Sequence, residues 1–145
     1  MPADRFGPIE AALPELDFFV VGDGFAWDLA EHPEALDAHF QTWAKEPTTG
    51  VWRLDVFREP HEGDTWIARR DPRIRMPYAE LILRTPEGIP YLRPEVALLF
   101  KAKARFPKNE DDFAAVLLHL SPAARRWLRE ALAMVHPGHA WLGMV

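Results

Sequence analysis

The stretch Val51–Phe57, VWRLDVF, is the strongest strand signal in the sequence. β-Branched and aromatic residues favour strands, and side chains alternate across a strand, so we expect a central strand with two faces. An unpaired buried carboxylate is very costly, so Asp55 must meet water, a cation or a hydrogen-bond donor. From the strand alone, a solvated Asp55 paired with Arg53 and a ligand Asp55 are about equally compatible. One face is expected to carry Trp52, Leu54 and Val56, and the other Val51, Arg53, Asp55 and Phe57.

Length and composition narrow the class of protein. A chain of 145 residues with 48% hydrophobic and 27% charged residues suits one globular domain with a real core. The net charge of −5 argues against a general nucleic-acid surface. The chain has no cysteine, which excludes disulfides and thiolate metal sites. The first residues lack the pattern of a signal peptide, and no apolar segment approaches the roughly 20 residues of a membrane span, so we expect a cytoplasmic protein without a membrane partner.

The first two thirds of the chain favour short strands. Fourteen prolines divide the chain into short elements. Residues 78–83 fit either a helix or a strand. The other expected elements are a short helix at 3–13, a hairpin formed by 17–21 and 25–29, a loop or single helical turn at 30–38, an antiparallel meander of 39–45, 51–57 and 65–70, and an extended segment at 88–92.

From Pro94 onward the period becomes helical. Pro94 suits the first turn of a helix that runs to about Ala104, and Asn109 can cap a second helix through Leu120. Ser121 and Pro122 open a third helix, which His136-Pro137-Gly138 ends. The fold class is therefore α+β: a mixed, largely antiparallel sheet over residues 1–93, followed by about three helices over residues 94–145, in one domain. The third helix carries one apolar stripe, made of Ala124, Trp127, Leu128, Ala131, Leu132 and Val135.

Residue patterns alone indicate no active site. The six histidines show no HExxH spacing, and a structural role is favoured over metal binding. Neither GxSxG nor a phosphate loop ending in GK[ST] occurs. Lys101 and Arg105, four residues apart on one expected helical face, could hold a polyphosphate, although a solvated face is favoured. The basic run at residues 69–75 could contact phosphate or a partner, but its Asp and Pro favour a solvated turn.

Three longer phrases carry a resemblance. They are LDVFREPHEGDTWIARRDPRI (54–74), GIPYLRPEVALLFKAKARFPKNEDDF (88–113) and VHPGHAWL (135–142). Together they resemble small bacterial nucleotidyltransferase-fold proteins, whose relatives include the aminoglycoside and lincosamide nucleotidyltransferases. The resemblance covers nearly the whole chain.

The resemblance implies a chemistry and a set of residues. In that family, two carboxylates in a D-x-D or D-x-E pattern and a third on a later strand hold two Mg²⁺ ions, which position a nucleoside triphosphate such as ATP and activate the hydroxyl of a small-molecule acceptor. Asp55 matches the third carboxylate, and so implies a catalytic metal ligand. Lys101 matches a lysine near the nucleotide phosphates. Lys108 and Asp112 match the K-D-x-x-D-F pattern of the nucleotide site, with Asn109 where Asp is common.

The sequence departs from the family at its beginning. The glycine-rich segment and the paired carboxylates should precede the PADRF stretch, whereas this sequence starts at Met1. Glu15 and Asp17 copy the spacing, but they match the next strand instead. We therefore expect an N-terminally truncated nucleotidyltransferase-like protein that is catalytically impaired. The alternatives are a non-catalytic binding or oligomerisation module, expected to form a homodimer, and an active enzyme whose start lies further upstream.

Overall fold

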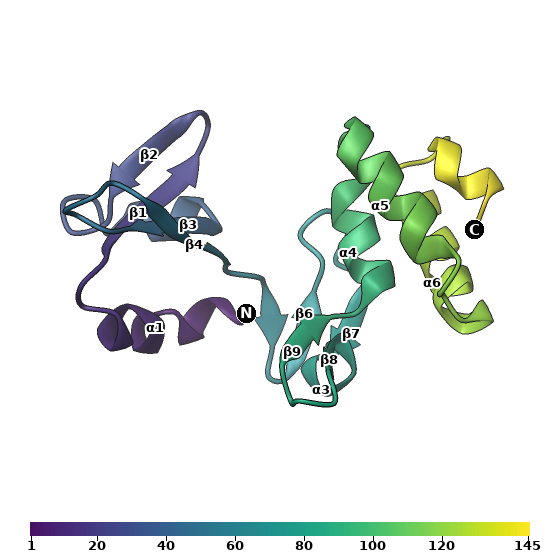
Figure 1. The fold of residues 1–145 in the computed structure, drawn as a ribbon, viewed down its shortest axis with the longest axis horizontal. Coiled ribbons are helices and arrows are strands. Elements are labelled where there is room, and N and C mark those ends of the chain that lie inside the picture. Colours follow the sequence, from purple (N-terminus) through teal and green to yellow (C-terminus); the bar gives the residue numbers. More distant parts are fainter. The chain divides into compact units, whose positions relative to one another are not determined.

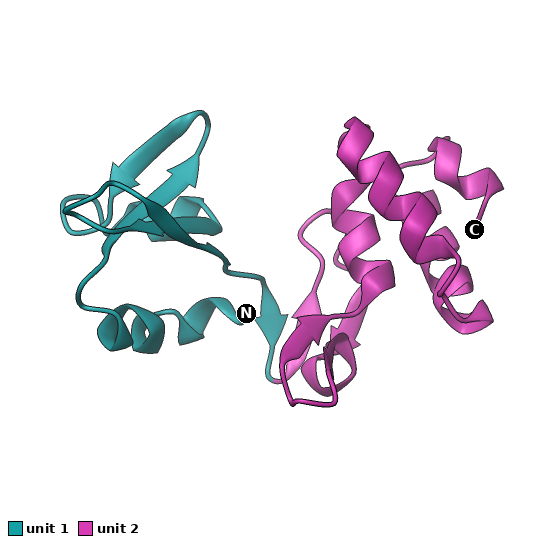
Figure 2. Ribbon diagram, in the orientation of Figure 1, with its two compact units in different colours: residues 1–63 teal, residues 64–145 magenta.

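The computed structural model describes residues 1–145 and separates them into two compact units. Residues 1–63 form the sheet unit and residues 64–145 the helical unit (Figure 2). Each unit has its own cluster of buried apolar side chains. The boundary lies before the helical segment that the sequence predicts from residue 94. The single domain predicted for residues 1–145 stays a prediction.

An antiparallel sheet with the strand order β2-β1-β3-β4 organises the sheet unit (Figure 1). The first helix, the hairpin at residues 17–29 and the helical turn before residue 39 are confirmed. The elements are the 3₁₀ helix η1 (Ala3–Arg5), α1 (Gly7–Ala12), β1 (Asp17–Gly22), β2 (Phe25–Asp28), α2 (Ala35–Ala38), β3 (Gln41–Lys45), β4 (Trp52–Phe57) and β5 (His61–Glu62).

One face of this sheet is buried. Val20 of β1 and Ala44 of β3 are fully inaccessible to solvent. Phe18 meets Phe6 edge to face, with their ring centroids 5.8 Å apart. Such aromatic pairs add about 0.5–1.5 kcal/mol to the free energy gained by burying their area. The alternation of β1 therefore builds the core that joins the sheet to the N-terminal helical segment.

Arg58, immediately after β4, is a buried charge of the sheet unit. Its guanidinium donates to the Thr42 hydroxyl at 3.2 Å, to the Leu36 carbonyl at 2.9 Å and to the His39 carbonyl. Burial lowers the pKa of Arg58, and the charge of Asp37 partly opposes this shift. Arg58 therefore ties the end of the sheet to α2 and to the chain that follows α2.

Gly22 leaves space for an aromatic stack. A Cβ atom at Gly22 would lie 2.1 Å from Nδ1 of His39, whose ring stacks on Trp27 at 4.7 Å and 10°. Gly22 is not among the glycines with positive φ. Steric room rather than backbone freedom therefore requires glycine at this position.

The strand expected to be central is an edge strand. β4 pairs with β3 on one side and is the last strand of its sheet. β6 (Thr65–Ile67) belongs to the helical unit and pairs with β7 (Arg75–Pro77). The predicted meander is therefore confirmed for β3 and β4 and wrong for its third strand, because alternation predicts a strand but not its neighbour.

A β-bulge changes the predicted faces of β4. In the pairing of β3 with β4, Arg53 is the extra residue opposite the register shift. Trp52 therefore lies on the other face of the sheet, with its ring 5.5 Å from Phe19 and 5.3 Å from Trp43. The prediction that Trp52 shares a face with Leu54 is wrong, because it assumed an unbroken ladder.

The helical unit combines two hairpins with three main helices (Figure 1). α4 packs against both α5 and α6. With the antiparallel sheets, these helices confirm the predicted α+β class. The elements are β6 (Thr65–Ile67), β7 (Arg75–Pro77), α3 (Tyr78–Leu81), β8 (Ile82–Arg84), β9 (Pro90–Leu92), α4 (Pro94–Lys101), α5 (Pro107–Leu117), α6 (Pro122–Val135) and the 3₁₀ helix η2 (Ala140–Gly143).

α6 behaves as its sequence predicts. The Ser121 hydroxyl accepts from the amide of Ala124 at 3.2 Å and caps the helix. Leu128 and Leu132 of the predicted stripe are fully buried. α6 is the longest helix at 14 residues, and no helix is long and apolar enough to cross a bilayer.

Candidate functional site

Asp55 lies on the exposed face of β4. Its carboxylate accepts two hydrogen bonds from the side-chain amide of Gln41, one to each oxygen at 3.0 Å. Gln41 comes from β3, where Trp43 lies directly opposite Asp55. Of the two interpretations of Asp55 taken from the strand alone, the pairing with Arg53 is wrong, because Arg53 pairs with Glu46 at 2.6 Å.

The surface beside Asp55 is aromatic. Phe19, Trp43 and Trp52 gather on this face of the sheet, and we call them the aromatic face. The ammonium of Lys45 lies 4.4 Å from the ring centroid of Phe19 and 5.5 Å from that of Trp52. Cation–π contacts of this kind contribute about 0.5–1 kcal/mol at exposed sites. Asp55 therefore lies beside the aromatic face, where the Gln41 amide holds its carboxylate.

Asp55 does not belong to a ready-made cluster of metal ligands. No group of three or more histidine, aspartate or glutamate side chains is arranged to hold a metal ion. Mg²⁺ prefers octahedral oxygen ligands and usually binds through one or two carboxylates together with substrate phosphates. Asp55 could supply one such ligand. Its predicted role as catalytic metal ligand stays a prediction.

The other predicted site residues meet on α4 and α5. The ammonium of Lys101 lies 2.8 Å from the carboxylate of Asp112, and each side chain is about a third exposed. This hydrogen bond lowers the pKa of Asp112, and the charges of Lys101 and Lys108 lower it further. The structure therefore brings Lys101, Lys108 and Asp112 into one electrostatic group, which we call the lysine–aspartate group.

The lysine–aspartate group can exchange partners. A partly exposed ion pair contributes at most about 1 kcal/mol because solvent screens it. A ligand phosphate carries more charge and more acceptor oxygens than one carboxylate. Lys101 could therefore turn from Asp112 to a phosphate at low cost, with Lys108 as a second cation close enough to act on the same carboxylate.

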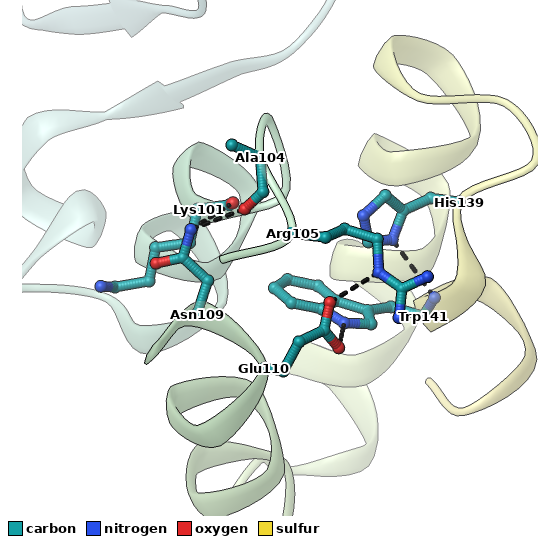
Figure 3. A network of polar contacts seen from close by, with 7 residues as sticks. All are labelled: Lys101, Ala104, Arg105, Asn109, Glu110, His139 and Trp141. Carbon is teal, nitrogen blue, oxygen red and sulfur yellow. Dashed lines mark hydrogen bonds and ion pairs between the residues drawn. The ribbon is translucent and has the colours of Figure 1, made fainter. Parts of the chain in front are cut away.

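The predicted pairing of Lys101 with Arg105 on one helical face is wrong. α4 ends at Lys101, and Arg105 lies in the loop before α5. The guanidinium of Arg105 donates to Glu110 at 2.7 Å, and the other oxygen of Glu110 accepts from the indole of Trp141 at 2.9 Å (Figure 3). The hydrogen bond from Arg105 and then that from Trp141 lower the pKa of Glu110. In Figure 3 the side chain of Lys101 points away from this group.

Asn109 has a different role from the predicted one. α5 begins at Pro107, with Phe106 before it, so Asn109 does not cap α5. Its side-chain amide donates to the carbonyls of Lys101 at 3.1 Å and of Ala104 at 2.7 Å (Figure 3). Asn109 thus closes the end of α4 and fixes the backbone at Lys101. One hint of this different role was visible in the sequence: Asn109 stands where the K-D-x-x-D-F pattern commonly has Asp.

The basic run after β6 contains a turn, as predicted. Arg73 donates to Asp71 at 2.9 Å, and this bond holds the pKa of Asp71 at about 2. Arg70 instead donates to the carbonyl of Leu99, on α4, at 3.3 Å. Arg73 therefore stabilises the turn itself, whereas Arg70 connects the segment to α4.

The histidines at the end of α6 have structural partners. Nδ1 of His139 accepts from the amide of Trp141 at 3.2 Å, and the Trp141 ring stacks on Phe113 at 4.1 Å. His136 lies 3.4 Å from Arg70. These contacts agree with the preference for a structural role over metal binding.

The predicted site residues are divided between the two units. Asp55 belongs to the sheet unit, and Lys101, Lys108 and Asp112 belong to the helical unit. Comparisons of the chain with protein-family models, with curated proteins and with solved structures find no match. The resemblance to nucleotidyltransferases therefore rests on the sequence phrases alone.

Proposed function

We propose that the chain is a nucleotidyltransferase-like protein that binds the phosphates of a nucleoside triphosphate through its helical unit. The lysine–aspartate group carries this proposal: Lys101 and Asp112, which match two positions of the resembled motif, are in contact at 2.8 Å. Two lysines near one displaceable carboxylate suit a polyphosphate with its Mg²⁺. The proposed reaction class is nucleotidyl transfer from ATP to a hydroxyl of a small molecule of the aminoglycoside or lincosamide type.

Transfer by residues 1–145 alone is expected to be impaired. Two-metal phosphoryl chemistry needs several carboxylates to hold both ions, and Asp55 supplies one. ATP binding is expected to persist because it depends on Lys101 and Lys108. The proposal therefore predicts that the protein binds ATP but transfers its nucleotidyl group poorly or not at all.

Titration calorimetry with ATP and MgCl₂ tests the binding step. Lys101→Gln and Lys108→Gln are each expected to weaken ATP binding about 5- to 10-fold, the loss of one charge-assisted contact. Arg126→Gln, on an exposed part of α6, removes the same charge elsewhere and should leave the affinity unchanged. Equal weakening by all three variants would contradict a phosphate site at the lysine–aspartate group.

A nucleotidylation assay across aminoglycosides and lincosamides tests the expected impairment. We expect no turnover above the rate without protein. Clear turnover that disappears in Asp55→Ala would overturn the impairment and assign Asp55 its catalytic role.

A binding or oligomerisation module is the second candidate, and the edge strand β4 favours it. β4 has no strand beyond it in its sheet, and Trp52 and Leu54 are 48% and 37% exposed. An apolar edge strand favours pairing with another chain, most simply a second copy around a two-fold axis.

Light scattering at micromolar concentration tests this candidate. A dimer is expected, and Leu54→Lys should shift it to monomer because a charge at the edge opposes strand pairing. Leu118→Lys, at a residue 78% exposed on the helical unit, is the control and should leave the dimer intact. A clean monomer of the unaltered protein would contradict the candidate.

A further inference from the structure

A cavity of about 180 Å³ opens in the helical unit. Its apolar wall is formed by Trp66 and Ala68 at and just after β6, by Leu99 and Phe100 of α4, and by Val135 of α6. Trp66 is 1% exposed and meets Phe100 edge to face at 6.0 Å, so it holds Phe100 from within the core, while the partly exposed Phe100 and Val135 offer apolar surface to a ligand. The apolar wall is therefore fixed before any ligand arrives.

The rim of the cavity is cationic. Arg69 and Arg70, after β6, and Lys103, after α4, all line it, and no aspartate or glutamate does. The guanidinium of Arg70 is oriented by the Leu99 carbonyl at 3.3 Å and lies 3.4 Å from Nε2 of His136. Burial, followed by the charges of Arg70 and His139, lowers the pKa of His136, in keeping with a positive local potential. Three cations thus border an apolar hollow without a lining carboxylate.

The size of the cavity limits the ligand. An engineered apolar cavity of about 150 Å³ is known to accept one benzene ring. A space of about 180 Å³ therefore suits a single ring, with its charged substituent left at the open rim. Arginine recognises carboxylate and phosphate groups through paired N–H donors, and lysine adds a point charge.

We propose that this cavity binds a small anion made of one aromatic ring and a carboxylate or phosphate group. The ring lies against Phe100 and Val135, and the anionic group meets Arg69, Arg70 and Lys103. This site differs from the lysine–aspartate group, because Lys101, Lys108 and Asp112 do not line the cavity. The proposal consequently does not depend on nucleotide binding.

Calorimetric titration of the full chain tests the proposal with four probes. Phenyl phosphate and benzoate are expected to bind saturably, and their ratio distinguishes a phosphate ligand from a carboxylate ligand. Benzyl alcohol, which has the ring without the charge, and inorganic phosphate, which has the charge without the ring, should each bind at least about 10-fold more weakly. Absence of saturable binding of both ring anions up to about 10 mM would overturn the proposal. Equal binding of benzyl alcohol or of inorganic phosphate would also overturn it.

Two matched variants locate the binding. Lys103→Gln changes an exposed residue. It should weaken the binding of phenyl phosphate or benzoate, whichever binds more tightly, about 5- to 10-fold. Arg126→Gln removes one positive charge away from the cavity and should have no effect. Binding should shift the amide NMR signals of Phe100 and Val135. Shifts confined to other regions, or equal weakening by both variants, would contradict the assignment.

Discussion

The two units differ in the size of their apolar cores. The sheet unit buries a cluster of five apolar residues, whereas the cluster of the helical unit has seventeen. The sheet unit compensates with polar contacts: Thr42, Arg58 and Glu59 are all buried in it. Units of about 60 residues bury a smaller fraction of their surface than larger domains do and are marginally stable. We infer that the sheet unit depends on specific hydrogen bonds and the helical unit on packing.

The largest effect is expected from breaking the packing of the helical unit. Trp141 is fully buried, stacks on Phe113 and donates to Glu110. Trp141→Ala should lower the free energy of unfolding by about 3–5 kcal/mol, since it removes a large buried ring and leaves a cavity. Urea denaturation measures the loss, and hydrogen exchange should locate it in residues 64–145. Met144→Ala, at a residue 49% exposed, is the control; losses of similar size in both variants would contradict the comparison.

The polar side of the comparison is tested at Arg58. Arg58→Ala removes the donor for two carbonyls and a hydroxyl, and buried groups that lose their partner cost about 1–3 kcal/mol each. We expect a loss of about 3 kcal/mol, with lower hydrogen-exchange protection in residues 1–63. Arg53→Ala, at a side chain 54% exposed, should change stability by less than about 0.5 kcal/mol. If Arg58→Ala left the free energy of unfolding unchanged, the sheet unit would not depend on these hydrogen bonds for its stability.

A smaller effect is expected at the start of α6. Ser121→Ala should cost about 1 kcal/mol because the amide of Ala124 loses its acceptor. Ser121→Asp, which restores an acceptor, should recover most of the loss. Failure of the aspartate variant to recover stability would show that the cap contributes little beside the packing of α6.

The smallest effect is a pH dependence at Asp71. Its pKa is lowered to about 2 by Arg73, so the contribution of this carboxylate to stability is present above its ordinary value of 3.8 and is lost as the pH falls toward 2. Carboxyl NMR should find the midpoint near pH 2 in the unaltered protein and closer to the ordinary value in Arg73→Gln. Identical midpoints in the two proteins would mean that Arg73 does not set this pKa.

Local sequence patterns predicted most of the helices and strands, but they did not predict which strands pair with each other. The stripe of α6 and its Ser121 cap follow from helical spacing and capping chemistry, which act within a few residues. The position of β4 at a sheet edge depends on which strand pairs with which, and no alternation pattern encodes that choice. The bulge at Arg53 also escaped prediction, because one inserted residue leaves the composition of the strand unchanged.

The candidate site was predictable where a motif named its residues. Lys101 and Asp112 were matched from the phrases LLFKAK and PKNEDDF, and the structure brings them together. The Arg105–Glu110–Trp141 group escaped prediction because Trp141 lies 31 positions beyond Glu110 in the chain. The cavity rim escaped for the same reason, since Arg70 and Lys103 become neighbours of one cavity only after α4 packs on β6.

The space above Gly22 has a consequence for recognising relatives of this chain. Because an alanine there would collide with the imidazole of His39, the two positions are sterically coupled. The carbonyl of His39 also accepts a hydrogen bond from the guanidinium of Arg58, so displacing residue 39 would disturb this buried side chain as well. In related sequences a larger residue at position 22 should therefore appear together with a smaller one at position 39. The identity of these two residues therefore tests whether a candidate relative keeps the stack of His39 on Trp27.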